Sequence, residues 1–165
     1  MIILGLDPGT AIVGWGVIDT GARHDVSKAK CLAYNCIITD KGLRDAQRLL
    51  AIANGVEALL QEHKPDLVAV EKLFFTNNQK TAMTVSQARG VLLLIAERFG
   101  VPIVEYNPME IKLALTGYGR AEKKQIQEMI KLILHLETIP KPDDAADALA
   151  IAVTAAQTIR SLPSR

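Results

Sequence analysis

Acidic residues at three distant points of the chain are the side chains best suited to chemistry. Asp7 and Glu71 each end an apolar run, and Asp143, Asp144 and Asp147 follow a proline-rich segment near the end of the chain. Carboxylates that face one another without protons repel strongly, and raised pKa values or bound cations relieve that repulsion. Magnesium suits such a group because it prefers oxygen ligands and keeps water and substrate phosphate in its coordination shell.

Magnesium held in this way would predict hydrolysis of a phosphodiester. Two ions about 4 Å apart can activate a water on one side of the phosphorus and stabilise the leaving oxygen on the other. We therefore expect a site with two Mg²⁺ ions, and the sequence leaves Mn²⁺ open as a substitute.

Each acid also has a purely structural interpretation. The segment 7–10, Asp-Pro-Gly-Thr, is a good β-turn, and Glu71 can mark the return of a strand to solvent. Acids in the first turn of a helix complement its dipole. The dipole does not explain why the three C-terminal aspartates share a helix face with Ile151 and Thr154. We therefore expect these carboxylates to point inward.

Hydrophobic periodicity and turn residues predict the elements that must position these acids. Strands are expected at 1–7, 13–19, 30–38, 66–71 and 101–106. Helices are expected at 43–63, 81–99, 108–116 and 122–136, with a last helix that follows Pro142 and runs to about 159. This order predicts an α/β fold with a five-stranded mixed sheet, three antiparallel strands first, and helices on both faces. We expect one domain at 1–160 and a frayed tail at 161–165.

Composition limits the class of protein. The chain has 165 residues and a net charge of +1, so its overall field would not draw it to nucleic acid or to membranes. Cys31 and Cys36 are five residues apart in one predicted strand, so we expect them on opposite faces, reduced and in the core. Without an apolar run of eighteen residues or a signal segment, the sequence predicts a cytoplasmic protein with no membrane segment. The three histidines are expected at the surface.

One lysine lies on the predicted buried face of its helix, where a functional residue could be placed. In the predicted helix 122–136, Lys123 lies within the arc of buried apolar positions, whereas Lys124 and Lys131 lie outside it. A cation in the first turn opposes the helix dipole, and its phase aims Lys123 at the sheet edge, where it could contact a phosphate. A lysine that curls around the helix start is an equally good interpretation of the phase alone.

Five short motifs lie in order over nearly the whole chain: ILGLDPGT at 3–10, VEKLF at 70–74, QARG at 87–90, GRAEK at 119–123 and DAADALA at 144–150. Taken together, these motifs resemble the RuvC family of Holliday-junction resolvases. The resemblance implies a ribonuclease H-like fold and a homodimer. It also implies an endonuclease of recombination and repair that makes paired, magnesium-dependent nicks in a four-way DNA junction, with a branch-migration motor as partner.

The resemblance also assigns residues. The family's four acids fall on Asp7, Glu71, Asp144 and Asp147, and this choice of Asp144 over Asp143 rests on the resemblance alone. The family's lysines fall on Lys123 and Lys112, and its aromatic residue falls on Phe74.

Phe74 and two arginines complete the predicted DNA contacts. An aromatic ring such as Phe74 can stack on a base exposed at a crossover, worth ~1–3 kcal/mol, or it can staple the start of the next helix. Arg89 and Arg120 are further candidates for contacts to phosphates.

Three other functions compete with this interpretation. Actin-like and sugar-kinase ATPases share the Asp-x-Gly-Thr turn, but they need two related domains. The YqgF-like nucleases are a nearer single-domain alternative that accounts less well for Phe74 and the aspartate helix. A non-catalytic module that binds junctions through a decayed site is the third, and the presence of all four acids and Lys123 argues against it.

Overall fold

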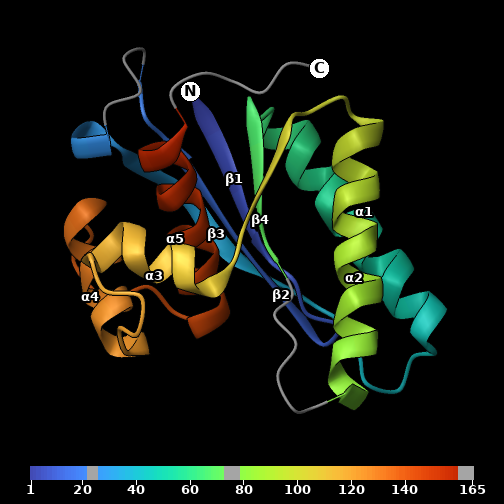
Figure 1. The fold of residues 1–165 in the computed structure, drawn as a ribbon. Helices are drawn as coiled ribbons and strands as arrows, with labels where there is room; N and C mark the ends of the chain where they lie inside the picture. The colour runs from blue at the N-terminus through green and yellow to red at the C-terminus, as the bar shows by residue number, and fades with distance from the viewer. Residues whose placement is uncertain (22–25, 73–78, 160–165) are drawn as a thin grey trace.

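The computed structural model describes residues 1–21, 26–72 and 79–159 and contains one five-stranded sheet. Its strands are β1 (Ile2–Asp7), β2 (Ile12–Asp19), β3 (Lys30–Ile38), β4 (Leu67–Glu71) and β5 (Ile103–Tyr106). They run in the order β3-β2-β1-β4-β5 (Figure 1). The first three pair antiparallel, and β4 and β5 join them in parallel. The predicted mixed sheet is confirmed.

Helices cover both faces of the sheet (Figure 1). One face packs against α1 (Asp45–His63) and α2 (Gln79–Arg98). The other packs against α5 (Asp143–Thr158), which in turn contacts α3 (Pro108–Thr116) and α4 (Lys123–Ile133). A short 3-10 helix, η1 (Val26–Lys28), precedes β3. The α4 helix ends earlier than predicted because His135 takes a positive φ of 52°, which an α-helix cannot continue through.

The alternation of side chains along β1 decides which face each residue serves. Ile3 packs in the core on the α5 side, whereas Leu4 and Leu6 pack in the core beneath α1 and α2. Since successive side chains of a strand point to opposite faces, Asp7 lies on the same face as Ile3. The same alternation in β4 places Glu71 on the α5 face.

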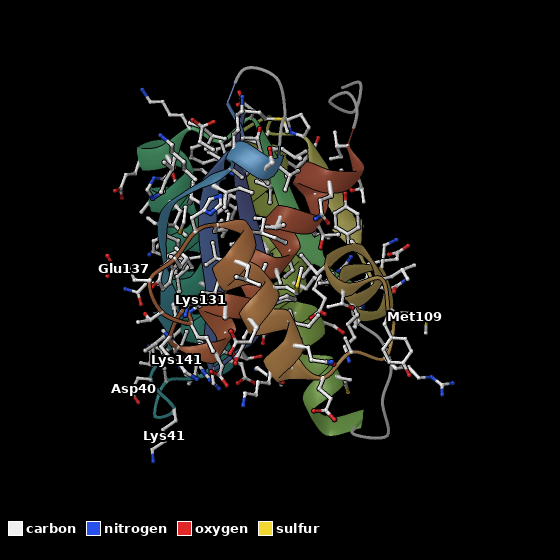
Figure 2. The ribbon with its side chains drawn as sticks, turned by 90° about the vertical axis from the view of Figure 1, so that its left-hand side faces the viewer. Asp40, Lys41, Met109, Lys131, Glu137 and Lys141 are labelled. Carbon is white, nitrogen blue, oxygen red and sulfur yellow. The ribbon has the colours of Figure 1, made fainter. Side chains whose placement is uncertain are left out.

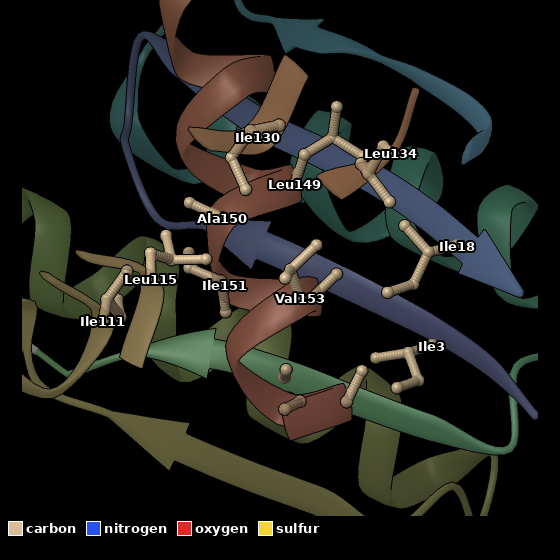
Figure 3. Packing of buried hydrophobic residues seen from close by; sticks show 14 of the residues in the cluster. Ile3, Ile18, Ile111, Leu115, Ile130, Leu134, Leu149, Ala150, Ile151 and Val153 are labelled. Carbon is tan, nitrogen blue, oxygen red and sulfur yellow. The ribbon is translucent and has the colours of Figure 1, made fainter. Parts of the chain in front are cut away.

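Large aliphatic residues fill much of the core between α5 and its neighbours. Figure 3 shows this cluster packed around α5. It includes Ile3, Ile18, Ile111, Leu115, Ile130, Leu134, Leu149, Ile151 and Val153. The helix α5 is buried almost all round from Ala145 to Ala156, as the absence of charged residues after Asp147 predicts.

Both cysteines are free and partly buried, but the prediction that they point to opposite faces is wrong. Cys31 pairs with Ile18 and Cys36 pairs with Gly14, and a β-bulge interrupts the register between these two pairs. Because the bulge adds one residue to β3, positions five apart come to lie on the same face, the one covered by α5.

The histidines differ in their environment. His63 is not a surface residue as predicted: its side chain is only 14% exposed, and its ring centroid lies 5.9 Å from that of Trp15. His135 is exposed, and His24 lies outside the described residues.

Candidate metal centre

The acids at the ends of β1 and β4 lie on neighbouring strands. The parallel register pairs Leu6 with Val70, so the next residues along, Asp7 and Glu71, come side by side on the α5 face. Burial and then the charge of Asp147 raise the pKa of Glu71, Lys112 offsets part of the rise, and the net value is about 7. An acid of the sheet and an acid of α5 are therefore close enough for their charges to interact.

Asp7 lies at the centre of the acidic group. Burial and then the charges of Glu71, Asp147 and Asp144, in that order, raise its pKa to a net value of about 8. The charge of Lys123 works in the opposite direction. The four acids that the sequence analysis selected are thus brought together in space, from three different elements.

Glycines in the sheet allow α5 to come this close. A methyl group added at Gly14 would lie 2.0 Å from the backbone oxygen of Asp144, and one added at Gly5 would lie 2.1 Å from that of Ala148. At Gly16 the added carbon would meet the side chain of Leu149 at 2.7 Å. The backbone of α5 therefore rests directly on the backbone of β1 and β2. The sequence analysis missed these glycines, whose signal was their alternation in β2 opposite an alanine-rich helix.

Lys123 reaches the acids from the first residue of α4. Its Nζ donates a hydrogen bond of 2.9 Å to Oδ2 of Asp147 and lies 3.6 Å from Oδ2 of Asp143. Burial opposes the charged form of Lys123, but the hydrogen bond to Asp147 and the charges of Asp147, Asp143 and Asp144 outweigh it and raise the pKa. The predicted orientation of Lys123 toward the sheet edge is thus what the structure shows.

Asp143 differs from the other acids of α5. Its side chain is 45% exposed, and Nζ of Lys141 donates a 2.5 Å hydrogen bond to its Oδ1. That hydrogen bond, with the charges of Lys123 and Lys141, lowers the pKa of Asp143. Lys141 lies at the surface on the side of the molecule occupied by α4 (Figure 2). Asp143 therefore lies at the rim, and the expectation that it points inward is wrong.

Asp147 is somewhat less exposed than Asp143, at 35% of its side chain, and its pKa moves in the other direction. Burial raises its pKa, the hydrogen bond and charge of Lys123 lower it, and Asp144 and Asp143 raise it again. The net effect is a raised pKa, so this carboxylate gains from any bound cation.

A cavity of about 260 Å³ opens beside the acids. Glu71 and Asp147 supply its acidic wall, and Lys112 and Lys123 supply a basic one. The remaining lining is apolar: Pro108, Ile111, Ile126, Ala150 and Ile151. Acidic and basic side chains that converge in a largely apolar cavity suit a phosphate bound through metal ions, since both the ions and the lysines attract its charge.

The donors present fit magnesium. Among the residues that the structure describes, no three His, Cys, Asp or Glu side chains are arranged to hold a single metal ion. Magnesium does not require such a cage, because it is usually bound by one or two carboxylates, with water and substrate phosphate completing its shell. Asp7, Glu71, Asp144 and Asp147 supply enough oxygens for two ions of this kind, and repulsion among them favours cation binding.

Cys36 lies beside this group, opposite Gly14 in the sheet. Burial raises the pKa of its thiol, the charge of Asp144 adds to the rise, and a hydrogen bond from the backbone of Ala145 partly offsets it. A thiol that keeps its proton is a poor metal ligand, so Cys36 does not compete with the carboxylates for a cation.

The remaining predicted residues lie in different places. Arg89 of α2 forms an ion pair with Glu105, which pairs with Val70 and so belongs to the face opposite the acids. Arg120 is exposed in a groove between α3 and α4. Phe74 lies outside the described residues. The structure therefore brings Lys112 and Lys123 to the acids but does not bring Arg89 there.

Comparison with known proteins decides the family. The model of the family described as "Crossover junction endodeoxyribonuclease RuvC" matches residues 3–155. The chain belongs to the RuvC family of crossover junction endodeoxyribonucleases. It is 55% identical over 157 residues to the RuvC of Brevibacillus brevis, a match that covers 95% of this chain and 92% of that protein. The corresponding protein of Heliobacterium modesticaldum is 48% identical over 159 residues, with 96% of each chain covered.

Solved structures agree with this assignment. The RuvC of Thermus thermophilus in complex with a Holliday junction substrate has a TM-score of 0.88 and 36% identity, and the match covers 95% of this chain and 93% of that one. A yeast mitochondrial Holliday junction resolvase, at 14% identity and a TM-score of 0.65, shares the fold alone, with 94% and 78% of the two chains covered. The predicted ribonuclease H-like fold is confirmed, and the ATPase alternative is wrong.

Proposed function

We propose that this chain resolves four-way DNA junctions by metal-assisted hydrolysis of phosphodiesters, with Asp7, Glu71, Asp144 and Asp147 as the metal ligands. The observation that carries the proposal is the convergence of these acids from β1, β4 and α5, where burial and then the charges of the other three raise the pKa of Asp7 to about 8. Membership of the RuvC family and the solved complex of a relative with a Holliday junction support the choice of substrate.

The metal ions supply Lewis-acid chemistry when bound: they activate the attacking water and neutralise charge on the phosphate. The chain supplies the rest. The four acids fix the ions, with Mg²⁺ as the proposed metal, two ions per site and Mn²⁺ as a possible substitute. Lys123 and Lys112 line the same cavity, where their ammonium groups can donate to oxygens of the reacting phosphate. The apolar wall lowers the local dielectric and strengthens these contacts.

We also propose contacts to DNA that lie outside the metal centre. Arg120 is exposed and free to meet a phosphate of a junction arm. A contact from Arg89 would first have to break its ion pair with Glu105. The stacking role proposed for Phe74 rests on the family motif.

Replacement of Asp7 with Asn tests the proposal most simply. The variant should cleave a fluorescent four-way junction roughly a thousandfold more slowly than wild type in magnesium, because it loses a ligand of the metal site. Its affinity for the junction in chelator should stay within a few-fold of wild type. Cleavage at near the wild-type rate would overturn the assignment, and binding without cleavage by wild type in magnesium would favour the non-catalytic module.

We also propose a homodimer, in which two sites meet the symmetric strands of a junction. Met83 and Leu94 are 72% and 59% exposed, and their separation of eleven residues, three turns, puts them on one face of α2. Gly90 lies between them, and, apart from its chain neighbours and the backbone of its own helix, no atom of the described residues lies within 4 Å of the position that a side-chain carbon would take there. Leu94→Asp should therefore give a monomer in sedimentation, whereas Met109→Asp, at an exposed position of α3, should leave the dimer intact. A wild-type protein that sediments only as a monomer would contradict the proposal.

Two further expectations rest on the sequence and the family: a cytoplasmic location and a branch-migration motor as partner. Within the described part of the chain, no helix is long and apolar enough to cross a membrane. Association with a motor protein is testable by co-purification in the presence of a junction.

A further inference from the structure

We propose that Asp143 is a positioning residue that holds the ammonium group of Lys123 at the mouth of the metal centre. The inference rests on the proposed function. It gives a role to the one acid of the aspartate helix that the assignment of metal ligands leaves out.

The contacts of Lys123 motivate the proposal. Its Nζ lies 2.9 Å from Asp147 and 3.6 Å from Asp143, so a single ammonium bridges two carboxylates one helical turn apart. Asp143 in turn accepts a 2.5 Å hydrogen bond from Lys141. The resulting chain of charges runs from the buried acids outward to the solvent.

The two partners of Lys123 differ in what else they do. Asp147 is coupled to Asp7 and Glu71, so a cation bound among these acids competes with Lys123 for the same carboxylate. Two cations on one carboxylate repel each other, so a metal ion bound to Asp147 would weaken the hydrogen bond between Asp147 and Lys123. Asp143 meets Lys123 through Oδ2 while its Oδ1 accepts the hydrogen bond from Lys141, so Oδ2 can still hold the ammonium group of Lys123 when Asp147 is engaged.

Without Asp143, a displaced Lys123 side chain would be free to swing into solvent. The side chain is already 52% exposed, and a lysine has many rotamers. With Asp143 in place, the ammonium stays at the rim, at the level where a phosphate enters the cavity. The expected benefit is to the rate at saturating substrate, because the residue improves the position of a group that acts on the reacting phosphate.

Kinetics with paired variants test this role. Asp143→Asn should lower the single-turnover rate of junction cleavage roughly two- to fivefold, the range expected for loss of one exposed ion pair, with little change in KM. Asp143→Glu should restore most of the rate, because it returns the carboxylate. Glu128→Gln removes one negative charge from an exposed position of α4 and should change the rate by less than about 1.5-fold.

A double-mutant cycle separates positioning from a general loss of charge. In a Lys123→Met background, Asp143→Asn should have no further effect, because the side chain that it positions is gone. An equal loss of rate in both backgrounds, or an Asp143→Asn variant that cleaves at the wild-type rate, would overturn the proposal.

Calorimetric titration with Mn²⁺ in the absence of DNA provides a readout that does not depend on cleavage. Asp143→Asn should bind Mn²⁺ with wild-type stoichiometry and an affinity within about twofold, whereas Asp144→Asn should bind it more than tenfold more weakly. A loss of affinity in Asp143→Asn equal to that in Asp144→Asn would make Asp143 a ligand and overturn the positioning role. The Asp7→Asn variant tells the two failures apart. Cleavage by Asp7→Asn would contradict the proposed function, whereas the outcomes above contradict only the role of Asp143.

Discussion

The two faces of the sheet are built on different principles. The face beneath α1 and α2 is filled by large aliphatic side chains, such as Leu4, Leu6 and Val70, which separate the helices from the sheet. The face beneath α5 becomes almost bare toward the acids, because Gly5 and Gly14 leave no side chain between helix and strands. Both faces therefore contribute hydrophobic stabilisation, but only the α5 face also has a region without side chains, where the backbone of the helix comes down to the level of the acids.

The difference shows how a stable fold can hold several carboxylates that are buried close to one another. Burial of Asp7 and Glu71, together with repulsion from neighbouring carboxylates, raises their pKa values and disfavours their charged forms in the fold. The hydrophobic clusters on the two faces of the sheet supply the stability that offsets this cost. Substitutions on the two faces should therefore affect stability and activity in different proportions.

Neighbouring residues of β2 give the sharpest contrast and the largest expected effect. Gly14→Ala should lower the cleavage rate a hundredfold or more, because the new methyl group meets the backbone of Asp144 and must displace it. Val13→Ala, on the opposite face, should cost about 2 kcal/mol of unfolding free energy and leave cleavage nearly unchanged. Chemical denaturation and single-turnover cleavage would measure both, and a Gly14→Ala variant with wild-type cleavage would contradict the role given to the glycines.

Adjacent lysines of α4 provide the next contrast. Lys123→Met should slow cleavage about a hundredfold, the typical loss for a donor that stabilises charge in the transition state. Lys124→Met should change the rate less than about threefold, because no contact links Lys124 to the acids. The same substitution at two successive positions keeps the change in net charge equal, and similar losses in both variants would count against a specific role for Lys123.

Protonation should control metal affinity. At pH 6 both Glu71, with a pKa of about 7, and Asp7, with a pKa of about 8, hold protons that a metal ion must displace. The affinity for Mg²⁺ should therefore be more than about tenfold weaker at pH 6 than at pH 8. Calorimetry at pH 6, 7 and 8 would measure the change, and an affinity independent of pH would show that these acids do not bind the metal.

The smallest expected effect is on the stability of the metal-free protein. The folded protein holds the pKa of Asp7 and Glu71 above their ordinary values, so their contribution to stability is present at low pH and lost as pH rises through about 7 and 8. In chelator, the Tm should fall between pH 6 and pH 9. Asp7→Asn should raise the unfolding free energy at pH 8 by about 2 kcal/mol, or about 4–8 °C in Tm.

Magnesium should abolish that difference by stabilising wild type alone. A Tm of Asp7→Asn below that of wild type at pH 8 in chelator would mean that the carboxylate of Asp7 is not destabilised in the fold.

Much of the architecture could be predicted because its signals are local. The three antiparallel strands, the long amphipathic helices and the acids at two strand ends all follow from periodicity and turn residues. The phase of Lys123 in α4 pointed to the sheet edge without excluding a lysine that curls around the helix start, and the structure adds its hydrogen bond to Asp147. The family motifs added the choice of Asp144 over Asp143.

The rest depended on contacts between distant segments. The ion pair between Arg89 and Glu105 joins α2 to β5, and neither residue signals its partner in the sequence. The bulge that turns Cys31 and Cys36 to the same face depends on how β3 pairs with β2. In the sequence, Gly14 looks like any glycine that weakens a strand, because its role depends on the contact with the backbone of α5.

The position of bound metal tests the central claim most directly. Crystals of the protein soaked in Mn²⁺ should show two anomalous peaks about 4 Å apart within coordination distance of Asp7, Glu71, Asp144 and Asp147, with Asp143 outside that distance. Peaks at another place on the molecule, or no peak at the acids at a concentration of Mn²⁺ that supports cleavage in solution, would contradict the account.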